Sequence, residues 1–275
     1  MSCRSVCADV VRSVVLFPFL IAVTVLGLPR LACAQSADDV AARVGTVARA
    51  MGAVEKDPWS VNAALTGSAS RGNTDTTNLR GTVIYVRDSG VWRFGSYLSG
   101  ALDTKNGQRA NERAGLNLAL ARRYGDAFRL VGIEEIVRAP LDGLRSRNLL
   151  GGMGVWTPPR QGIFEASFYL GAGWANEKYT TGEPNGNYGA GLTGASLAVA
   201  IAEKSTLNLV ASYTRDLDVG RNYKIGSSIS LKASINSVLG MQLNYAIAYD
   251  NAPVRGKVTT NNAFGAGLTL GWKGR

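Results

Sequence analysis

Histidine is absent from the 275-residue chain, and its three cysteines, Cys3, Cys7 and Cys33, all lie close to the N-terminus. Without histidine, Ser-His and Cys-His nucleophile systems and histidine proton shuttles are excluded. Beyond Cys33 no thiol remains for a disulfide or for a cysteine-based zinc site. Scattered carboxylates such as Asp142 and Glu177 are more often solvated or salt-bridged than paired for acid/base work. We therefore expect no enzyme activity and no cofactor.

The first 34 residues are typical of a secretory signal peptide. Arg4 and Arg12 precede a short apolar run, VVLFPFLIAVTVLGLP, and small residues follow it before a predicted cleavage ahead of Gln35. The run is broken by prolines and is shorter than the roughly 20 apolar residues of a spanning helix, which disfavours a membrane anchor. A lipoprotein signal with Cys33 as the lipidated residue is disfavoured too, because Arg30 stands where an aliphatic residue is needed. We expect the chain to be exported and residues 1–34 to be removed.

Positive charge exceeds negative charge, with 30 Lys and Arg against 20 Asp and Glu and a formal net charge of +10. In an exported protein such an excess favours contact with anionic lipid or sugar phosphates. The basic residues are spread along the chain and are not gathered in a stripe with stacking aromatics. We therefore expect no nucleic-acid partner.

Residues 35–58 differ from the rest of the chain, because their apolar residues recur at helical spacing. Val40, Val44, Val47 and Met51 lie on one side of such a helix, and Asp57-Pro58 ends the pattern. We predict a short amphipathic helix here and place it in the periplasm.

From Trp59 to the C-terminus, large apolar residues alternate with small or polar ones. Phe264, Leu268 and Leu270 take one phase of the last segment, and Gly267 and Thr269 take the other. Most segments exceed ten residues, the length that a tilted strand needs to cross a bilayer. The twelve segments are 59–70, 75–87, 91–103, 109–123, 126–138, 145–157, 162–175, 187–201, 205–217, 221–236, 239–250 and 259–273.

The connections between these segments alternate in length. Even-numbered ones are tight, for example DSG and YGD, whereas most odd-numbered ones are longer and polar, including TKNGQR, APLDGLR, NEKYTTGEPNGN and NAPVRGKVTTNN. Short periplasmic turns and longer external loops are typical of outer-membrane barrels. Residues 59–275 are therefore predicted to form an all-β, transmembrane, antiparallel up-and-down β-barrel of about twelve strands in the outer membrane.

Aromatic residues support the same fold, because they gather near both ends of the predicted strands. Two such rows match the girdles of a membrane barrel wall. One row, at the tight turns, comprises Trp59, Tyr85, Trp92, Tyr124, Phe128, Trp156, Phe164 and Trp272. The other comprises Trp174, Tyr179, Tyr188, Tyr213, Tyr223, Tyr249 and Phe264.

The segment DAFRLVGIEEIVR does not fit a single alternation. Phe128 and Leu130 are in one phase and Val131 and Ile133 in the other, so one glutamate of the pair 134–135 faces lipid in either register. A bulge near Gly132 would switch the phase. The sequence leaves this register open.

The chain also resembles a known family, the salt-induced outer-membrane proteins, catalogued as a domain of unknown function. The resemblance rests on WSVNAALTGSASRGNT, LDGLRSRNLLGGMGV, FYLGAGWANEKYT and YDNAPVRGKVTTNNAFGAGLTLGW, and it extends from Trp59 to Trp272. It implies an outer-membrane barrel and supplies no activity, cofactor or catalytic residue. The chain end, with Gly267, Leu270 and Trp272, is also similar to the signal by which the barrel-assembly machinery recognises its clients, although it continues as KGR.

Two functions follow from a barrel of this size, and the sequence leaves them open. One is a narrow channel for small polar or anionic solutes, and the other is a structural envelope component whose interior is filled. The basic residues expected to face the lumen are Arg93, Arg113, Lys224, Lys232 and Lys273.

A third possibility is a surface barrel that binds lipopolysaccharide or another partner through basic external loops, without transport. The residues expected on or beside those loops are Arg145, Arg147, Lys178, Arg221, Arg255 and Lys257. Outer-membrane lipid and lipopolysaccharide are the expected surroundings in each case.

Overall fold

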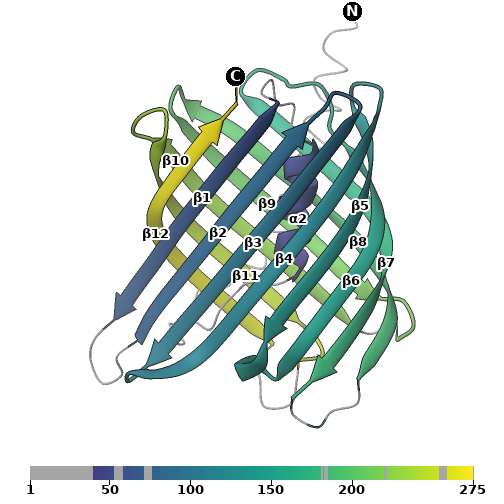
Figure 1. The fold of residues 1–275 in the computed structure, drawn as a ribbon, viewed down its shortest axis with the longest axis vertical. Coiled ribbons are helices and arrows are strands. Elements are labelled where there is room, and N and C mark those ends of the chain that lie inside the picture. Colours follow the sequence, from purple (N-terminus) through teal and green to yellow (C-terminus); the bar gives the residue numbers. More distant parts are fainter. Residues whose placement is uncertain are drawn as a thin grey trace, which may run out of the picture. The chain divides into compact units, whose positions relative to one another are not determined.

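In the residues that it describes, a computed structural model shows a barrel of β-strands and one α-helix (Figure 1). It describes residues 40–52, 58–70, 76–180, 182, 185–219, 222–253 and 259–274. The predicted signal peptide and cleavage site lie outside these residues. None of the helices in the described ranges is long and apolar enough to cross a membrane.

Twelve strands form the barrel in the described part of the chain. They are β1 (Trp59–Ser70), β2 (Thr76–Asp88), β3 (Trp92–Lys105), β4 (Gln108–Tyr124), β5 (Phe128–Ala139), β6 (Leu144–Trp156), β7 (Phe164–Tyr179), β8 (Gly186–Ala202), β9 (Ser205–Asp216), β10 (Tyr223–Ser234), β11 (Leu239–Asp250) and β12 (Thr260–Lys273). The helix is α2 (Val40–Gly52), and a 3-10 turn, η1 (Pro140–Asp142), lies between β5 and β6.

Each strand pairs antiparallel with its sequence neighbours, and β1 pairs with β12 to close the barrel. The predicted all-β, twelve-stranded, up-and-down barrel is therefore confirmed. Two predicted segments, 59–70 and 239–250, match β1 and β11 to the residue, and the largest difference is β7, which continues to Tyr179. Alternation predicted these strands well because each residue step along a strand reverses the face.

The outer face of the barrel is apolar and exposed. Leu150 and Leu170 are 68% and 72% exposed, and Leu268 and Leu270 of β12 are exposed as well. Thr269 lies between those two leucines of β12 and Gly267 lies just before them. Both are turned toward the interior, where Thr269 lines a cavity. A continuous apolar outer wall is the surface that lipid requires.

Strand β5 keeps one phase throughout, which resolves the register that the sequence left open. Its ladders to β4 and β6 run through Gly132 without a register shift. Val131, Ile133 and Glu135 face the interior and are buried, whereas Glu134 is exposed on the outer face. The strand is apolar on both faces, and this is why its sequence fits no simple alternation.

Connection lengths are sorted less cleanly than predicted. The TKNGQR connection is a two-residue turn at Asn106 and Gly107, with φ of 50° and 75°. Two positive φ values in a row suit the tight hairpin turns whose twist matches that of the strands. The longer connections, 180–185, 217–222 and 251–259, do lie at one end of the barrel, whereas 157–163 is a long connection at the other end. We call these ends the long-loop end and the short-turn end.

The aromatic row at the short-turn end is exposed on the outer face. Its exposed members are Trp59, Trp92, Tyr124, Phe128, Trp156, Phe164 and Trp272. Arg122 lies over the rings of Trp92 and Tyr124, with its Cζ 5.5 and 5.2 Å from the two centroids. At the long-loop end Tyr213 stacks on Tyr223, but Tyr179 and Tyr188 do not join the row. Both donate hydrogen bonds to the buried Glu177, so their side chains face the interior.

Candidate functional site: the barrel interior

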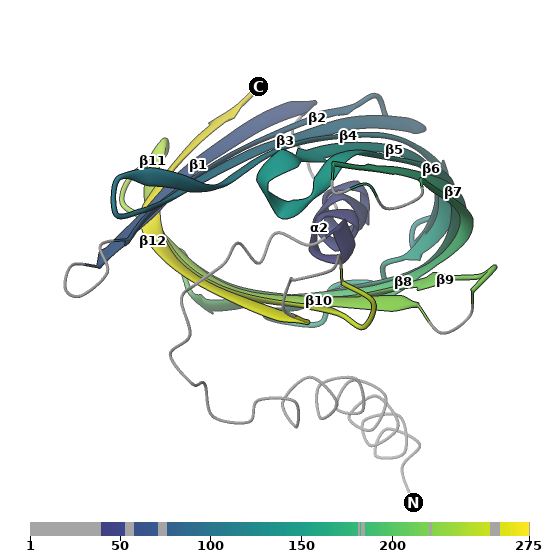
Figure 2. The same cartoon turned by 90° about the horizontal axis from the view of Figure 1, so that it is seen from below.

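Helix α2 lies inside the barrel, within the ring of strands that Figure 2 shows end-on. Val44, Val47, Ala48 and Met51 recur at the spacing of one helix face, and all are buried in the main apolar cluster. The strand residues of the same cluster point inward from β2 to β8 and include Val86, Ala119, Ala121, Val131, Ile133, Leu149, Met153, Val155, Tyr169 and Leu192. The second apolar face of β5 is therefore the surface on which the helix packs.

The predicted helix is present, but its expected place in the periplasm is wrong. Its neighbours are β3 to β10, from the inside. The periplasmic placement assumed a polar lumen, in which the apolar face of the helix would have had no apolar surface to pack against. Because β3 to β8 turn apolar side chains inward, burial in the lumen removes both surfaces from water.

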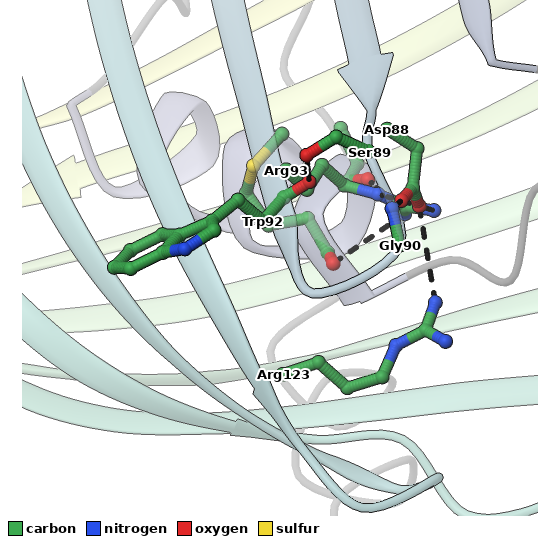
Figure 3. A network of polar contacts seen from close by, with 8 residues as sticks. Asp88, Ser89, Gly90, Trp92, Arg93 and Arg123 are labelled. Atoms are coloured by element: carbon green, nitrogen blue, oxygen red, sulfur yellow. Dashed lines mark hydrogen bonds and ion pairs between the residues drawn. The ribbon is translucent and has the colours of Figure 1, made fainter.

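Arg93 of β3 fixes the C-terminal end of α2 at the short-turn end of the barrel. Its guanidinium donates a hydrogen bond of 3.1 Å to the carbonyl oxygen of Ala50, and its Nε donates one of 2.9 Å to Asp88 (Figure 3). Arg93 is only 2% exposed, and Arg123 lies 3.9 Å from the same carboxylate. A cation at the last helical carbonyls complements the negative end of the helix dipole.

A network of charged side chains lies nearer the long-loop end and links β5, β6 and β7 to β10 and β11 across the interior. The carboxylate of Glu177 accepts hydrogen bonds from Tyr179 and Tyr188, and it lies 3.3 Å from Arg147 and 3.5 Å from Lys224. Lys224 also pairs with Asp250 at 3.3 Å, and Arg147 lies 4.0 Å from Glu135. Arg147 and Glu135 are both 0% exposed. Opposite charges at such distances compensate for the loss of water.

The other half of the interior holds a cavity of about 360 Å³. It runs beside α2 along β1, β2, β10, β11 and β12, where the inward residues are small or polar, such as Thr66, Ser228, Ser230 and Thr269. Four cationic side chains line it, namely Arg49, Arg80, Lys232 and Lys273. Among the described residues that line the cavity there is no Asp or Glu. The cavity therefore carries an excess of positive charge.

Two of these cations have few compensating contacts. Arg49 of α2 donates a hydrogen bond to Oδ1 of Asn208, and the buried Nε of Arg80 has no hydrogen-bond partner in the described ranges. Burial lowers the pKa of Arg49, against the opposing effect of Glu165. A guanidinium nevertheless stays protonated at ordinary pH.

The five basic residues predicted for the lumen lie in different settings. Arg93 and Lys224 are paired with acids, as described, and Arg113 lies 2.9 Å from Asp142 of η1. Lys232 and Lys273 line the cavity. Three of the five therefore hold the structure together, and two face the space through which a solute could move.

The residues predicted for external loops are only partly described. Arg145 of β6 and Lys178 of β7 are exposed near the long-loop end. The expected position of Arg147 on or beside an external loop is wrong. Arg147 is fully buried inside the barrel between two glutamates, where no external ligand reaches it. Arg221, Arg255 and Lys257 lie outside the described residues.

Arg49 and Arg80 were not predicted as lumen residues, although the sequence contained a signal for one of them. Arg80 is in phase with Asn78, Thr82 and Ile84, which alternation along TTNLRGTVIYV places on the inner face. Arg49 carried no such signal, because it faces the lumen only through the position of α2.

A closed antiparallel barrel of twelve strands, with an exposed apolar outer face and a rim of aromatic residues, is an outer-membrane-type β-barrel. The chain belongs to DUF481, a family described as proteins of unknown function, whose sequence profile matches residues 63–272. No curated relative matches it.

Solved structures of outer-membrane barrels are similar in fold. The translocator domain of the autotransporter NalP from Neisseria meningitidis superposes with a TM-score of 0.51 at 16% identity, over 84% of this chain and 94% of that one. The NanC porin gives 0.48 at 9% identity, over 78% and 99%, and the KdgM porin with disordered oligogalacturonate gives 0.45 at 7%, over 76% and 98%. These neighbours are porins and a translocator barrel rather than enzymes. At such identities the likeness concerns the fold alone.

Proposed function

We propose that this protein is an integral outer-membrane barrel that conducts small anionic solutes through the part of its lumen that α2 leaves open. The observation that carries the proposal is the cavity beside the helix, which is lined by Arg49, Arg80, Lys232 and Lys273 and by no carboxylate among the described residues. A pore lined by one sign of charge concentrates the opposite ion and lowers its entry barrier.

The division of the interior supports conduction through one side only. Helix α2 contacts β3 to β10, and it shares its apolar cluster with inward residues of β2 to β8. The Glu177 network joins that side to Lys224 of β10 and Asp250 of β11. The opposite side has small polar residues and unfilled volume. Because small side chains leave room and hydroxyls replace part of an ion's hydration, a hydrated anion can pass there while larger solutes are excluded.

A structural envelope barrel is the second candidate, and the buried helix favours it. An apolar helix face packed on the wall stabilises the barrel and fills much of the lumen. The two candidates differ in conductance, because a plugged barrel passes no current. Binding of lipopolysaccharide through loop residues receives less support, since Arg147 is buried inside the barrel.

The test is conductance of the purified protein in a planar bilayer under a KCl gradient. We expect single channels whose reversal potential shows a preference for chloride over potassium. The double variant Arg80→Gln and Lys232→Gln should lose most of this preference. Lys178→Gln is the matched control, because it removes one positive charge from the outer face and should leave selectivity unchanged. Absence of current from folded protein would support the structural barrel instead.

Two further parts of the proposal concern the cell. Cleavage before Gln35 and location in the outer membrane are tested by N-terminal sequencing and by carbonate extraction of membrane fractions. The resemblance to salt-induced proteins suggests a link to salt or envelope stress. An immunoblot should therefore show more protein after growth at high salt, and an unchanged amount would remove that link.

A further inference from the structure

We infer that Arg49 of α2 and Lys232 of β10 form a binding site for a multiply charged oxyanion, of the phosphate or carboxylate class, within the cavity. The inference rests on the proposed conduit and adds a discrete binding site to it. Helix α2, inside the lumen, supplies one of the two cations of this site, Arg49.

Asn208 sets the position of Arg49. The side chain of Asn208 is 4% exposed on the inner face of β9, and its Oδ1 accepts a hydrogen bond from one terminal nitrogen of the guanidinium. A guanidinium has five N–H donors in a rigid fork, so this contact orients the group and leaves further donors for a ligand.

Lys232 is placed beside that guanidinium by the strand register. Asn208 pairs with Ser230 on β10, and Lys232 follows two residues later on the same inner face. Diagonal neighbours of this kind lie about 7–8 Å apart, within reach of long side chains. Arg49 and Lys232 both line the cavity, so their like charges face the same space.

Among the described residues Lys232 has no hydrogen bond or ion pair, and no carboxylate lines the cavity around it. Glu165 of β7 is the acid that acts on Arg49, and it does not line the cavity. Two like charges held together inside a barrel are costly unless an anion lies between them. A dianion would satisfy both and remove the repulsion.

The neutral groups around the two cations suit oxygen atoms with several lone pairs. Ser230 and Gln242 line the cavity on the same wall as Lys232, and Thr46 lines it one helical turn before Arg49. Hydroxyl and amide donors can complete the coordination of phosphate or carboxylate oxygens, while Arg49 offers a bidentate contact. Chloride, with one charge and no fixed geometry, would gain less from this arrangement.

The probe is inorganic phosphate, titrated by calorimetry into the full-length mature protein in detergent and chloride-free buffer. We expect saturable binding with one site per chain. Lys232→Gln and Arg49→Gln should each weaken it by roughly 10- to 100-fold, the loss expected for one charge-assisted hydrogen bond. Lys232→Arg should retain binding, and Lys178→Gln, on the outer face, should behave as the parent protein does. Heat-modifiable gel mobility shows that each variant is folded.

A citrate titration separates the two ligand chemistries, because tighter binding of citrate than of phosphate identifies the carboxylate class. If neither anion binds the parent protein, or if Lys232→Gln and Arg49→Gln bind both as well as the parent does, the inference is wrong.

The inference and the proposed function fail separately. Anion-selective current with no phosphate or citrate binding removes the site and keeps the conduit. Binding that depends on Lys232 in a barrel that passes no current keeps the site and removes the conduit.

Discussion

Met51, in the last turn of α2, occupies the space that Gly95 leaves open on the inner face of β3. A Cβ at position 95 would overlap the Cε atom of Met51. We therefore expect Gly95→Val to push Met51 and the C-terminal end of the helix away from β3 and to narrow the cavity. Single-channel recordings should show a smaller conductance than that of the parent protein. Gly100→Val is the control, because Gly100 lies on the exposed outer face of the same strand and should leave conductance unchanged.

Removing the side chain of Arg93, which holds the C-terminal end of α2, should loosen the helix while the strands stay paired. In Arg93→Met the carbonyl of Ala50 loses its donor, and Asp88 keeps the hydrogen bond from the Gly90 N–H and the longer contact with Arg123. We expect faster proteolysis within residues 40–52 while the strands keep their heat-modifiable mobility. Arg87→Met, on the outer face of β2, removes the same charge and should not change the proteolysis rate. Equal rates for all three proteins would show that Arg93 does not hold the helix.

The two faces of β12 should respond differently to a charge. Leu268 pairs with Leu65 of β1 and Met241 of β11, and all three are exposed on the outer face. Leu268→Arg should destabilise the folded barrel by roughly 2–4 kcal/mol, the cost of arginine facing the bilayer core. Thr269→Arg, one residue away and lining the cavity, should cost much less. Reversible denaturant unfolding in lipid vesicles measures both, and equal losses would contradict the assignment of faces.

Glu177 should be the most sensitive member of the buried charge network. Glu177→Gln removes one acid from both Arg147 and Lys224, which keep their contacts with Glu135 at 4.0 Å and Asp250 at 3.3 Å. Breaking a buried pair costs up to about 3–5 kcal/mol, less whatever those two acids compensate. The double variant with Lys224→Met, in a mutant cycle, should recover part of the loss. Additive effects of the two changes would mean that Glu177 and Lys224 are not coupled.

The orientation of the barrel in the membrane can be tested with single cysteines, because the cysteines of the sequence all precede the predicted cleavage site. Cysteines introduced at Asn185 and Pro253, at the long-loop end, should react in intact cells with an impermeant thiol reagent. Cysteines at Ser89 and Ser237, at the short-turn end, should react only after the outer membrane is opened. Labelling of Ser89→Cys in intact cells would reverse the orientation.

The sequence predicted the wall of this barrel far better than its contents. Alternation is a local property, so Leu268 and Thr269 could be assigned to opposite faces from their immediate neighbours alone. What lies against a face depends on residues distant in the chain. Val131 and Ile133 were unexplained because their partners, Val44 and Val47, belong to a segment more than eighty positions earlier.

The same limit explains why the sequence did not predict which basic residues are paired inside the barrel. Lys232 and Arg147 both alternate correctly onto the inner face, yet Lys232 faces the cavity and Arg147 is enclosed by Glu135 and Glu177. Arg147 was expected on or beside an external loop because it lies near the start of the predicted segment 145–157, but β6, which begins at Leu144, turns it inward. Arg147 is paired by the neighbouring strands β5 and β7, whereas Lys224 of β10 reaches Glu177 of β7 only because the curved wall brings these distant strands face to face.

Closure itself depends on the shortest ladder in the described wall. The β1–β12 ladder has eight residue pairs, from Ser60–Lys273 to Gly67–Ala266, whereas β1 and β2 share twelve. β1 and β12 also border the cavity, and in the described part of the chain α2 packs on β3 to β10 instead. The wall is therefore least supported at this ladder, and the ring closes only when β12 pairs with β1. Loss of β12 (Thr260–Lys273) would leave two open sheet edges in the membrane, and no shorter closed ring could form from the strands that remain without a change of register.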